Sequence, residues 1–261
     1  MKTAGAWDGA MSRIHSWHWN RGDFDSQWRH ICERLAADPA SGELLSQTSF
    51  KEVRLLTVPA EGGEFRVAYK VYREKRLFRY LLRPSLAARE ARGFDVVAEL
   101  GIPAVEVLAL GERRRLFDVV EAYFVTRFSE GAGTMDCFHK SPERHDLLLS
   151  LLRENIARLG RMHAAGYIHG GLHPRNILWR ESADGAVESI WIDLATVRRV
   201  SLDRSGWKLI LTDLSDLAEK FALTQPELDM LMAEYRKVCD LPVAYVTRSD
   251  HPYKLSRAVR R

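Results

Sequence analysis

The chain of 261 residues is 46% hydrophobic and 28% charged, a composition that is typical of soluble globular proteins and argues against wholesale disorder. Its formal net charge is +4, and no apolar run approaches the roughly 18 residues that cross a bilayer. The three cysteines are far apart and predict neither a disulfide framework nor a zinc site, so we expect a cytoplasmic protein.

The first half of the chain is predicted to be rich in strands. Residues 1–45 are interpreted as an N-terminal extension. Ser85 is a suitable helix cap, and the helix that it begins is expected to run to Leu100, just before Gly101-Ile102-Pro103. Four segments have the alternation and residue types of strands: 50–58, 64–72, 105–110 and 122–128.

The second half is predicted to be mainly helical and to follow a hinge at Gly131-Ala132-Gly133. Apolar residues at helical spacing mark the buried face of one helix: Leu148, Leu152, Ile156, Leu159 and His163. Two short strands and two more helices complete the prediction: 176–180, 189–199, 213–221 and 225–238. We therefore expect an α+β protein, with a strand-rich lobe over 46–128 and a helix-rich lobe over 129–261.

Asn176 and Asp193 are candidate ligands of a hard cation, because each belongs to one of two adjacent short strands. Magnesium needs few protein ligands, since water and phosphate oxygens complete its octahedron. Asn176 alone is more often a turn residue. Asp193, however, lies in an otherwise apolar strand, where an unpaired carboxylate is costly to bury. The pair therefore predicts a Mg²⁺ site.

Lys70 and Glu90 are a candidate ion pair. In the segment 64–72, Lys70 shares one face of the strand with Ala68 and Tyr72. Glu90 lies on the apolar stripe of the following helix, where a lone carboxylate requires a cationic partner. The alternative is that both charges are solvated at the surface, as such charges usually are.

The segments HGGLHPRNIL (169–178) and WIDLATVRR (191–199) resemble the catalytic loop and the metal-binding segment of protein-kinase-like enzymes. That resemblance implies a bilobal fold, with an antiparallel-sheet N-lobe carrying one helix and a mainly helical C-lobe. It implies ATP as the phosphate donor and His169 as a structural histidine of the loop. It also makes Lys70 and Glu90 the bridge that holds the α- and β-phosphates.

The run LRPSLAAREARGFDVVAELGIPAVEVLALGE (82–112), together with the catalytic loop, is similar to bacterial lipopolysaccharide core kinases that act on heptose or Kdo sugars. Aminoglycoside and choline kinases share much of the loop, so the loop alone does not choose between these families. The resemblance implies a core sugar of lipopolysaccharide as the acceptor, at the cytoplasmic face of the inner membrane.

Two further residues are assigned to the nucleotide site. Ser49 ends a stretch, Ser46–Ser49, that lies where these enzymes carry a glycine-rich phosphate loop, although this stretch has no glycine. Its hydroxyls and backbone N–H groups are candidates for phosphate contacts. Phe128 ends the last strand before the hinge and is expected to lie beside the nucleotide.

Two further histidines and one of two aspartates are expected to shape the catalytic loop or its surroundings. His173 takes the place of the loop's lysine and either approaches the γ-phosphate or supports the loop. His163 is expected to pack in the core. Either Asp213 or Asp216 is expected to brace the loop from the following helix.

Gly171 stands where the family has the aspartate that orients the acceptor hydroxyl and accepts its proton. A general base contributes about 10² to 10⁴ in rate, whereas phosphoryl transfer depends mainly on positioning and charge stabilisation. We therefore expect either a slow or atypical kinase or a pseudokinase, a nucleotide-binding protein that regulates or scaffolds a partner. A protein that no longer binds nucleotide is the third hypothesis and ranks last.

Basic residues are clustered over 66–92, at Arg113-Arg114-Arg115 and over 254–261. Such clusters attract phosphate-bearing partners or an anionic membrane surface, or they are merely solvated faces. Aromatic residues are not interleaved with them, so we expect no nucleic-acid partner.

Overall fold

The computed structural model describes most of the chain, namely residues 14–19, 37–38, 40–60, 63–73, 83–115, 118–182, 185–218 and 221–240. The chain divides into two compact units. The first comprises residues 1–91 and 105–129, and the second comprises 92–104 and 130–261. The expected division at residue 128 lies next to the boundary at 129, but 92–104 belongs to the second unit and not to the first.

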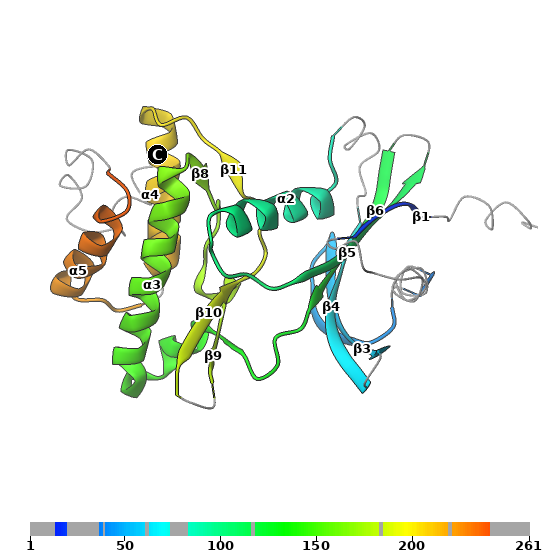
Figure 1. Ribbon diagram of the computed structural model, residues 1–261, viewed down its shortest axis with the longest axis horizontal. Coiled ribbons are helices and arrows are strands. Elements are labelled where there is room, and N and C mark those ends of the chain that lie inside the picture. The colour runs from blue at the N-terminus through cyan, green and yellow to red at the C-terminus, as the bar shows by residue number, and fades with distance from the viewer. Residues whose placement is uncertain are drawn as a thin grey trace, which may run out of the picture. The chain divides into compact units, whose positions relative to one another are not determined.

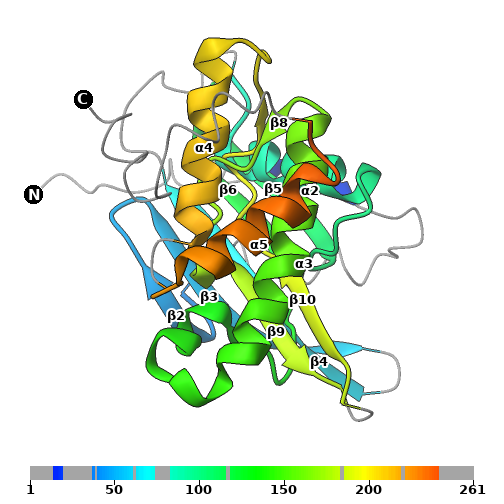
Figure 2. The ribbon, with the colours of Figure 1, turned by 90° about the vertical axis from the view of Figure 1, so that its left-hand side faces the viewer.

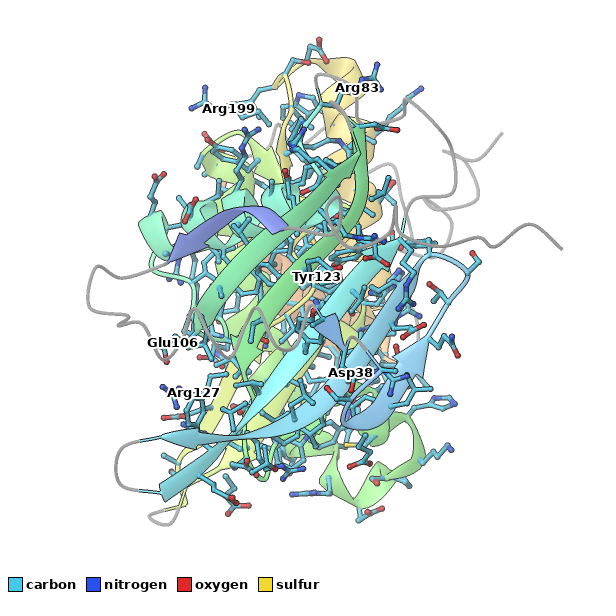
Figure 3. The ribbon with its side chains drawn as sticks, turned by 90° about the vertical axis from the view of Figure 1, so that its right-hand side faces the viewer. Asp38, Arg83, Glu106, Tyr123, Arg127 and Arg199 are labelled. Carbon is cyan, nitrogen blue, oxygen red and sulfur yellow. The ribbon has the colours of Figure 1, made fainter. Side chains whose placement is uncertain are left out.

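The first unit is built on a six-stranded antiparallel sheet with the order β1-β5-β6-β4-β3-β2, whose central strands lie side by side in Figures 1 and 3. Its strands are β1 Ile14–Trp19, β2 Glu43–Gln47, β3 Lys51–Ala60, β4 Gly63–Arg73, β5 Val107–Arg115 and β6 Asp118–Arg127. Tyr123 lies over the middle of the sheet in Figure 3, and the ion pair of Glu106 with Arg127 (2.7 Å) lies towards one end.

The N-terminal region expected as an extension contributes both edge strands of this sheet. β1 pairs with β5, with Trp19 opposite Ala109, and β2 pairs with β3, with Glu43 opposite Leu55. An edge strand needs only a neighbour's free backbone groups, so it forms without an alternating apolar pattern. Every residue of β2 is exposed, which explains why its sequence carried no such pattern.

One face of this sheet carries the core of the first unit. The strands alternate as expected, so Val67, Tyr69 and Val71 of β4 are buried on that face. Tyr69 and Tyr123 lie parallel there, with ring centroids 6.0 Å apart. The opposite face of β4 carries Lys70, and the helix that meets it is α2, Leu86–Glu99. The Ser85 hydroxyl accepts a hydrogen bond from the Ala88 N–H (3.1 Å), which confirms the predicted cap.

The second unit is mainly helical. α5 (Gln225–Arg236) packs along α3 (His145–Ala164), and α4 (Arg204–Ala218) also contacts α3 (Figure 2). All five residues of the predicted apolar stripe are buried in α3. The named elements, apart from three short 3₁₀ turns, are β7 Gly133–Thr134, α3 His145–Ala164, β8 Tyr167–Ile168, β9 Ile177–Glu181, β10 Val187–Trp191, β11 Arg198–Arg199, α4 Arg204–Ala218 and α5 Gln225–Arg236.

Of the boundaries in this unit, two differ most from the prediction. β10 ends at Trp191, because Asp193 adopts a positive φ of 61° that a strand does not accommodate. α4 begins at Arg204, nine residues earlier than expected, where the Asp203 carboxylate accepts a hydrogen bond from the Gly206 N–H (3.1 Å). α5 begins with a capping box, in which the Thr224 N–H donates to Glu227 (2.6 Å).

Candidate functional site

Lys70 and Glu90 form a buried ion pair in the first unit. The Lys70 Nζ lies 2.5 Å from Glu90 Oε1, and the Glu90 side chain has no exposed surface. Lys70 Nζ also lies 5.9 Å from the centroid of the Phe124 ring. The predicted pairing is confirmed, and the alternative of two solvated charges is wrong. A buried carboxylate that holds an ammonium group in this way fixes the position of a cation.

Tyr72 completes this cluster, and the sequence did not predict a role for it. Its hydroxyl donates a hydrogen bond to Glu90 Oε2, so the two oxygens of the carboxylate bind two different donors. The signal was present in the alternation of β4, which places Tyr72 on the same face as Lys70. What the sequence did not show is that the phenol reaches the helix.

Ser49 lies in the tight turn between β2 and β3. Thr48 organises this turn, because its hydroxyl accepts hydrogen bonds from the N–H groups of Phe50 (3.5 Å) and Lys51 (3.1 Å). Ser49 is exposed at the tip of the turn, so its role in phosphate binding stays a prediction. Phe128 lies under the Arg66 guanidinium, 4.6 Å from the ring centroid. Its role towards a nucleotide also stays a prediction.

The catalytic-loop segment of the second unit is held by Asp213 of α4. One carboxylate oxygen accepts the N–H of His169 (2.6 Å) and the other accepts the N–H of Gly170 (2.7 Å). Burial alone would raise the pKa of Asp213. The hydrogen bond from His163, the nearby charges and the backbone N–H of His169 outweigh burial, so the pKa lies below its usual value. Of the two candidates for this bracing role, Asp213 is therefore the residue that makes the contact.

His163 links Asp213 to α5. It is fully buried, as predicted, but it is not only a packing residue. Its Nε2 lies 3.4 Å from Asp213 Oδ2, and its Nδ1 lies 2.8 Å from the Tyr235 hydroxyl. A neutral imidazole that donates from Nε2 and accepts at Nδ1 satisfies both contacts. These partners lie 50 and 72 residues away in sequence, beyond the reach of any local pattern.

Gly171 has a φ of +149°, a conformation that side-chain-bearing residues rarely adopt. A Cβ atom built at this position meets no atom within 4 Å. The Gly171 carbonyl accepts a hydrogen bond from Asn176 Nδ2 (3.0 Å) and another from the His173 N–H (2.9 Å). The loop therefore has room for a side chain at this position, but its backbone conformation there suits glycine.

The residues expected to bind the metal lie on neighbouring backbone segments. Asn176 precedes β9 and Ile192 follows β10, and the Ile192 N–H donates to the Asn176 carbonyl (2.9 Å). Asp193 is the residue that follows Ile192, so its backbone lies next to this hydrogen bond. The hydrogen bond that Asn176 Nδ2 makes to Gly171 fixes the amide so that its oxygen remains the acceptor atom. One amide oxygen and one carboxylate suit Mg²⁺, which takes its other ligands from water and phosphate.

Asp193 is the one non-glycine residue with a positive φ in the described part of the chain. A residue in that region costs of order 1–3 kcal/mol and persists only where its surroundings impose it. Its neighbour Leu194 is fully buried against Gly93 of α2, where an added Cβ would lie 2.2 Å from the Leu194 carbonyl oxygen. The helix thus lies so close to this segment that only glycine fits at position 93.

His169 is buried and packs edge-on against Trp191, with ring centroids 5.6 Å apart. Trp191 Nε1 donates in turn to Asn155 Oδ1 of α3 (2.6 Å). Among the described residues, neither ring nitrogen of His169 has a hydrogen-bond partner. Burial lowers the pKa of His169, and the charges of Asp213 and Asp193 offset this only in part. Burial and the contact with Trp191 support the structural role that the loop resemblance implied for His169.

Acid is expected to destabilise the protein through His169. Because its pKa is lowered in the folded state, the unfolded chain binds a proton below about pH 6.5 that the folded chain does not. Stability should then fall as the pH decreases from that value, by at most about 1.4 kcal/mol per pH unit. Urea unfolding between pH 5 and 8 measures this slope. His169→Phe should flatten it, while replacement of the exposed His139 with Gln should not. An unchanged slope in His169→Phe would contradict the assignment.

The basic clusters are partly neutralised where the structure describes them. Arg113 pairs with Glu121 (2.8 Å) and Arg114 with Glu112 (2.5 Å). The remaining clusters, over 74–82 and 254–261, lie outside the described residues. Within the described part of the chain, none of the helices has the length and apolarity of a membrane span.

The predicted site residues fall into two ordered groups. Lys70 and Glu90 are joined in the first unit. In the second unit the loop over 169–176 is joined to Ile192, the residue before Asp193, by the backbone bond from Ile192 N–H to Asn176. His173 lies in this loop, where its backbone carbonyl accepts the Asn176 N–H (2.8 Å). Any residue could supply that carbonyl, so the role of the His173 side chain stays a prediction.

Comparisons with known proteins agree with these features. A solved structure of WaaP in complex with acyl carrier protein is similar, with a TM-score of 0.65 and 16% sequence identity over 91% of this chain and 95% of that chain. This match confirms the expected protein-kinase-like fold. A search of curated proteins finds no match. The model of the lipopolysaccharide kinase (Kdo/WaaP) family matches residues 65–235, most of the chain, and this protein therefore belongs to that family.

Proposed function

We propose that this protein is an ATP- and Mg²⁺-dependent phosphotransferase that acts on a sugar hydroxyl of the lipopolysaccharide core. The buried pair of Lys70 with Glu90 carries this proposal, because a fixed ammonium group is what the phosphates of a nucleotide require. The acceptor is lipid-linked, so the proposal places the enzyme at the cytoplasmic face of the inner membrane. Basic clusters are the candidates for peripheral contact with that surface.

In this mechanism Lys70 binds the α- and β-phosphates while Glu90 holds its position. Asn176 and Asp193 would hold Mg²⁺, which neutralises phosphate charge when bound. Asp213 fixes the loop that faces the acceptor by binding the N–H groups of His169 and Gly170. The acceptor oxygen forms a bond to the γ-phosphorus as the bond to the β–γ bridging oxygen breaks, ADP leaves, and the hydroxyl proton passes to water.

Gly171 limits this reaction, because no side chain at that position accepts the proton. The loss corresponds to about 10² to 10⁴ in rate. We therefore propose a slow or atypical kinase. The conformation of Gly171, with its φ of +149°, favours the second candidate function, a pseudokinase that binds nucleotide and regulates or scaffolds a partner. A pseudokinase has no need of a base, so its loop can keep a backbone conformation that suits only glycine at this position.

Gly171→Asp separates the two functions. The space around the position admits a carboxylate, so transfer of ³²P from ATP to dephosphorylated core lipopolysaccharide should rise by at least tenfold if the acceptor site is intact. Because the φ of Gly171 is strained for aspartate, we expect a loss of about 1–2 kcal/mol in stability. Gly185→Asp is the matched control, since Gly185 has a φ of +81° and equally open surroundings.

The outcomes of this assay are distinct. Transfer by the wild-type chain, increased in Gly171→Asp and not in Gly185→Asp, supports the kinase. Binding of ATP without transfer by either folded variant supports the pseudokinase. Absence of ATP binding in the wild-type chain contradicts both functions.

A further inference from the structure

The carboxylate of Glu90 is shared between two donors on one strand. Lys70 and Tyr72 are two residues apart in β4, so both side chains leave the same face of the sheet. Glu90 Oε1 accepts from the Lys70 ammonium at 2.5 Å, and Glu90 Oε2 accepts from the Tyr72 hydroxyl. All three side chains are buried, with 8% of Lys70, 5% of Tyr72 and none of Glu90 exposed. Water therefore does not substitute readily for any of these bonds.

This division gives each oxygen of the Glu90 carboxylate its own donor. An ammonium group has three donor protons, so the contact of Lys70 with Glu90 Oε1 does not by itself exclude a phosphate. If the phenol were absent, Glu90 Oε2 would be a buried acceptor without its donor, which is costly for a charged group. The carboxylate would then turn its second oxygen towards the same ammonium and compete with a bound phosphate.

We infer that Tyr72 is a positioning residue for the nucleotide site. It holds Glu90 in the orientation in which Lys70 is fixed and still able to bind the α- and β-phosphates. This inference rests on the proposed function, in which Lys70 binds those phosphates. It adds a third member to a cluster in which only the lysine and the glutamate had an expected role.

The test compares ligands with and without phosphates. ATP and adenosine are titrated calorimetrically, with Mg²⁺ present, into the full-length wild-type chain and Tyr72→Phe. We expect the variant to bind ATP about three- to tenfold more weakly, as the loss of one hydrogen bond of typical net strength predicts. Its affinity for adenosine should be unchanged, because adenosine has no phosphate for Lys70. General disturbance of the unit would weaken both ligands.

Tyr69→Phe is the matched control. It removes the same hydroxyl from the same strand, but Tyr69 lies on the opposite face, stacked against Tyr123. Neither affinity should change in this variant. In a Lys70→Met background, Tyr72→Phe should have no additional effect on ATP binding, because the residue acts through the lysine.

Two results would overturn the inference, and they differ. If the wild-type chain binds ATP and Tyr72→Phe binds it equally well, the role of Tyr72 fails while the proposed function stands. If the wild-type chain does not bind ATP, the proposed function fails and the role of Tyr72 fails with it.

Discussion

Lys70→Ala is expected to abolish the thermal stabilisation that MgATP gives to the wild-type chain and to lower the free energy of unfolding by about 3–5 kcal/mol. The two effects have one cause. Glu90 is buried without exposed surface, and the variant removes the ammonium group that lies 2.5 Å from its carboxylate. An uncompensated buried charge is destabilising, and the phosphates lose the cation that we propose binds them.

Stability and binding can be separated by a second variant. In Lys70→Met with Glu90→Leu, apolar side chains of similar volume replace both charges, and such replacements are often neutral for folding. This double variant should fold normally and still show no stabilisation by MgATP. Lys237→Ala is the control, because its pair with Glu234 is exposed at the surface and contributes little to stability. Full stabilisation by MgATP in the double variant would exclude Lys70 from the nucleotide site.

Asp213→Ala is expected to lower the free energy of unfolding by about 3–5 kcal/mol. The variant leaves the buried N–H groups of His169 and Gly170 without their acceptor, and each unsatisfied group costs about 1–3 kcal/mol. Asp213→Asn should lose less, since it keeps one acceptor oxygen. The catalytic loop should also open more often, because its anchor on α4 is gone.

Urea unfolding gives the first quantity, and hydrogen exchange of the loop amides gives the second. Asp229→Ala is the control, because Asp229 is exposed on α5 and accepts only from Gln225 among the bonds described (2.8 Å). It should change stability by less than about 0.5 kcal/mol. If the Gly170 amide exchanges no faster in Asp213→Ala than in the wild-type chain, Asp213 does not anchor the loop.

Periodicity predicted the buried elements of the fold and missed the exposed ones. The stripe of α3 could be read because one face of the helix is buried and the other is not. β1 and β2 could not, since edge strands depend on a distant neighbour; β2 is exposed throughout. The start of α4 was missed because Gly206 lies in its first turn, where it weakens the helical pattern.

In the candidate site, too, local sequence patterns predicted some contacts and not others. The spacing of Lys70 and Glu90 predicted their contact, because a strand and a helix each present one face to the other. The contact of His163 with Tyr235 joins residues 72 positions apart, and no local pattern predicts it. The φ of Gly171 was equally hidden, since glycine adopts almost any backbone conformation and its presence does not say which one.

The conformation of Gly171 also has an evolutionary consequence. A codon change that introduces aspartate would place a side chain on a backbone with a φ of +149°, so this single step carries strain before it yields a well-placed base. Full activity with an aspartate there then requires a second change that reshapes the loop. The backbone of the loop, and not only the missing side chain, therefore sets how readily a base can arise at this position.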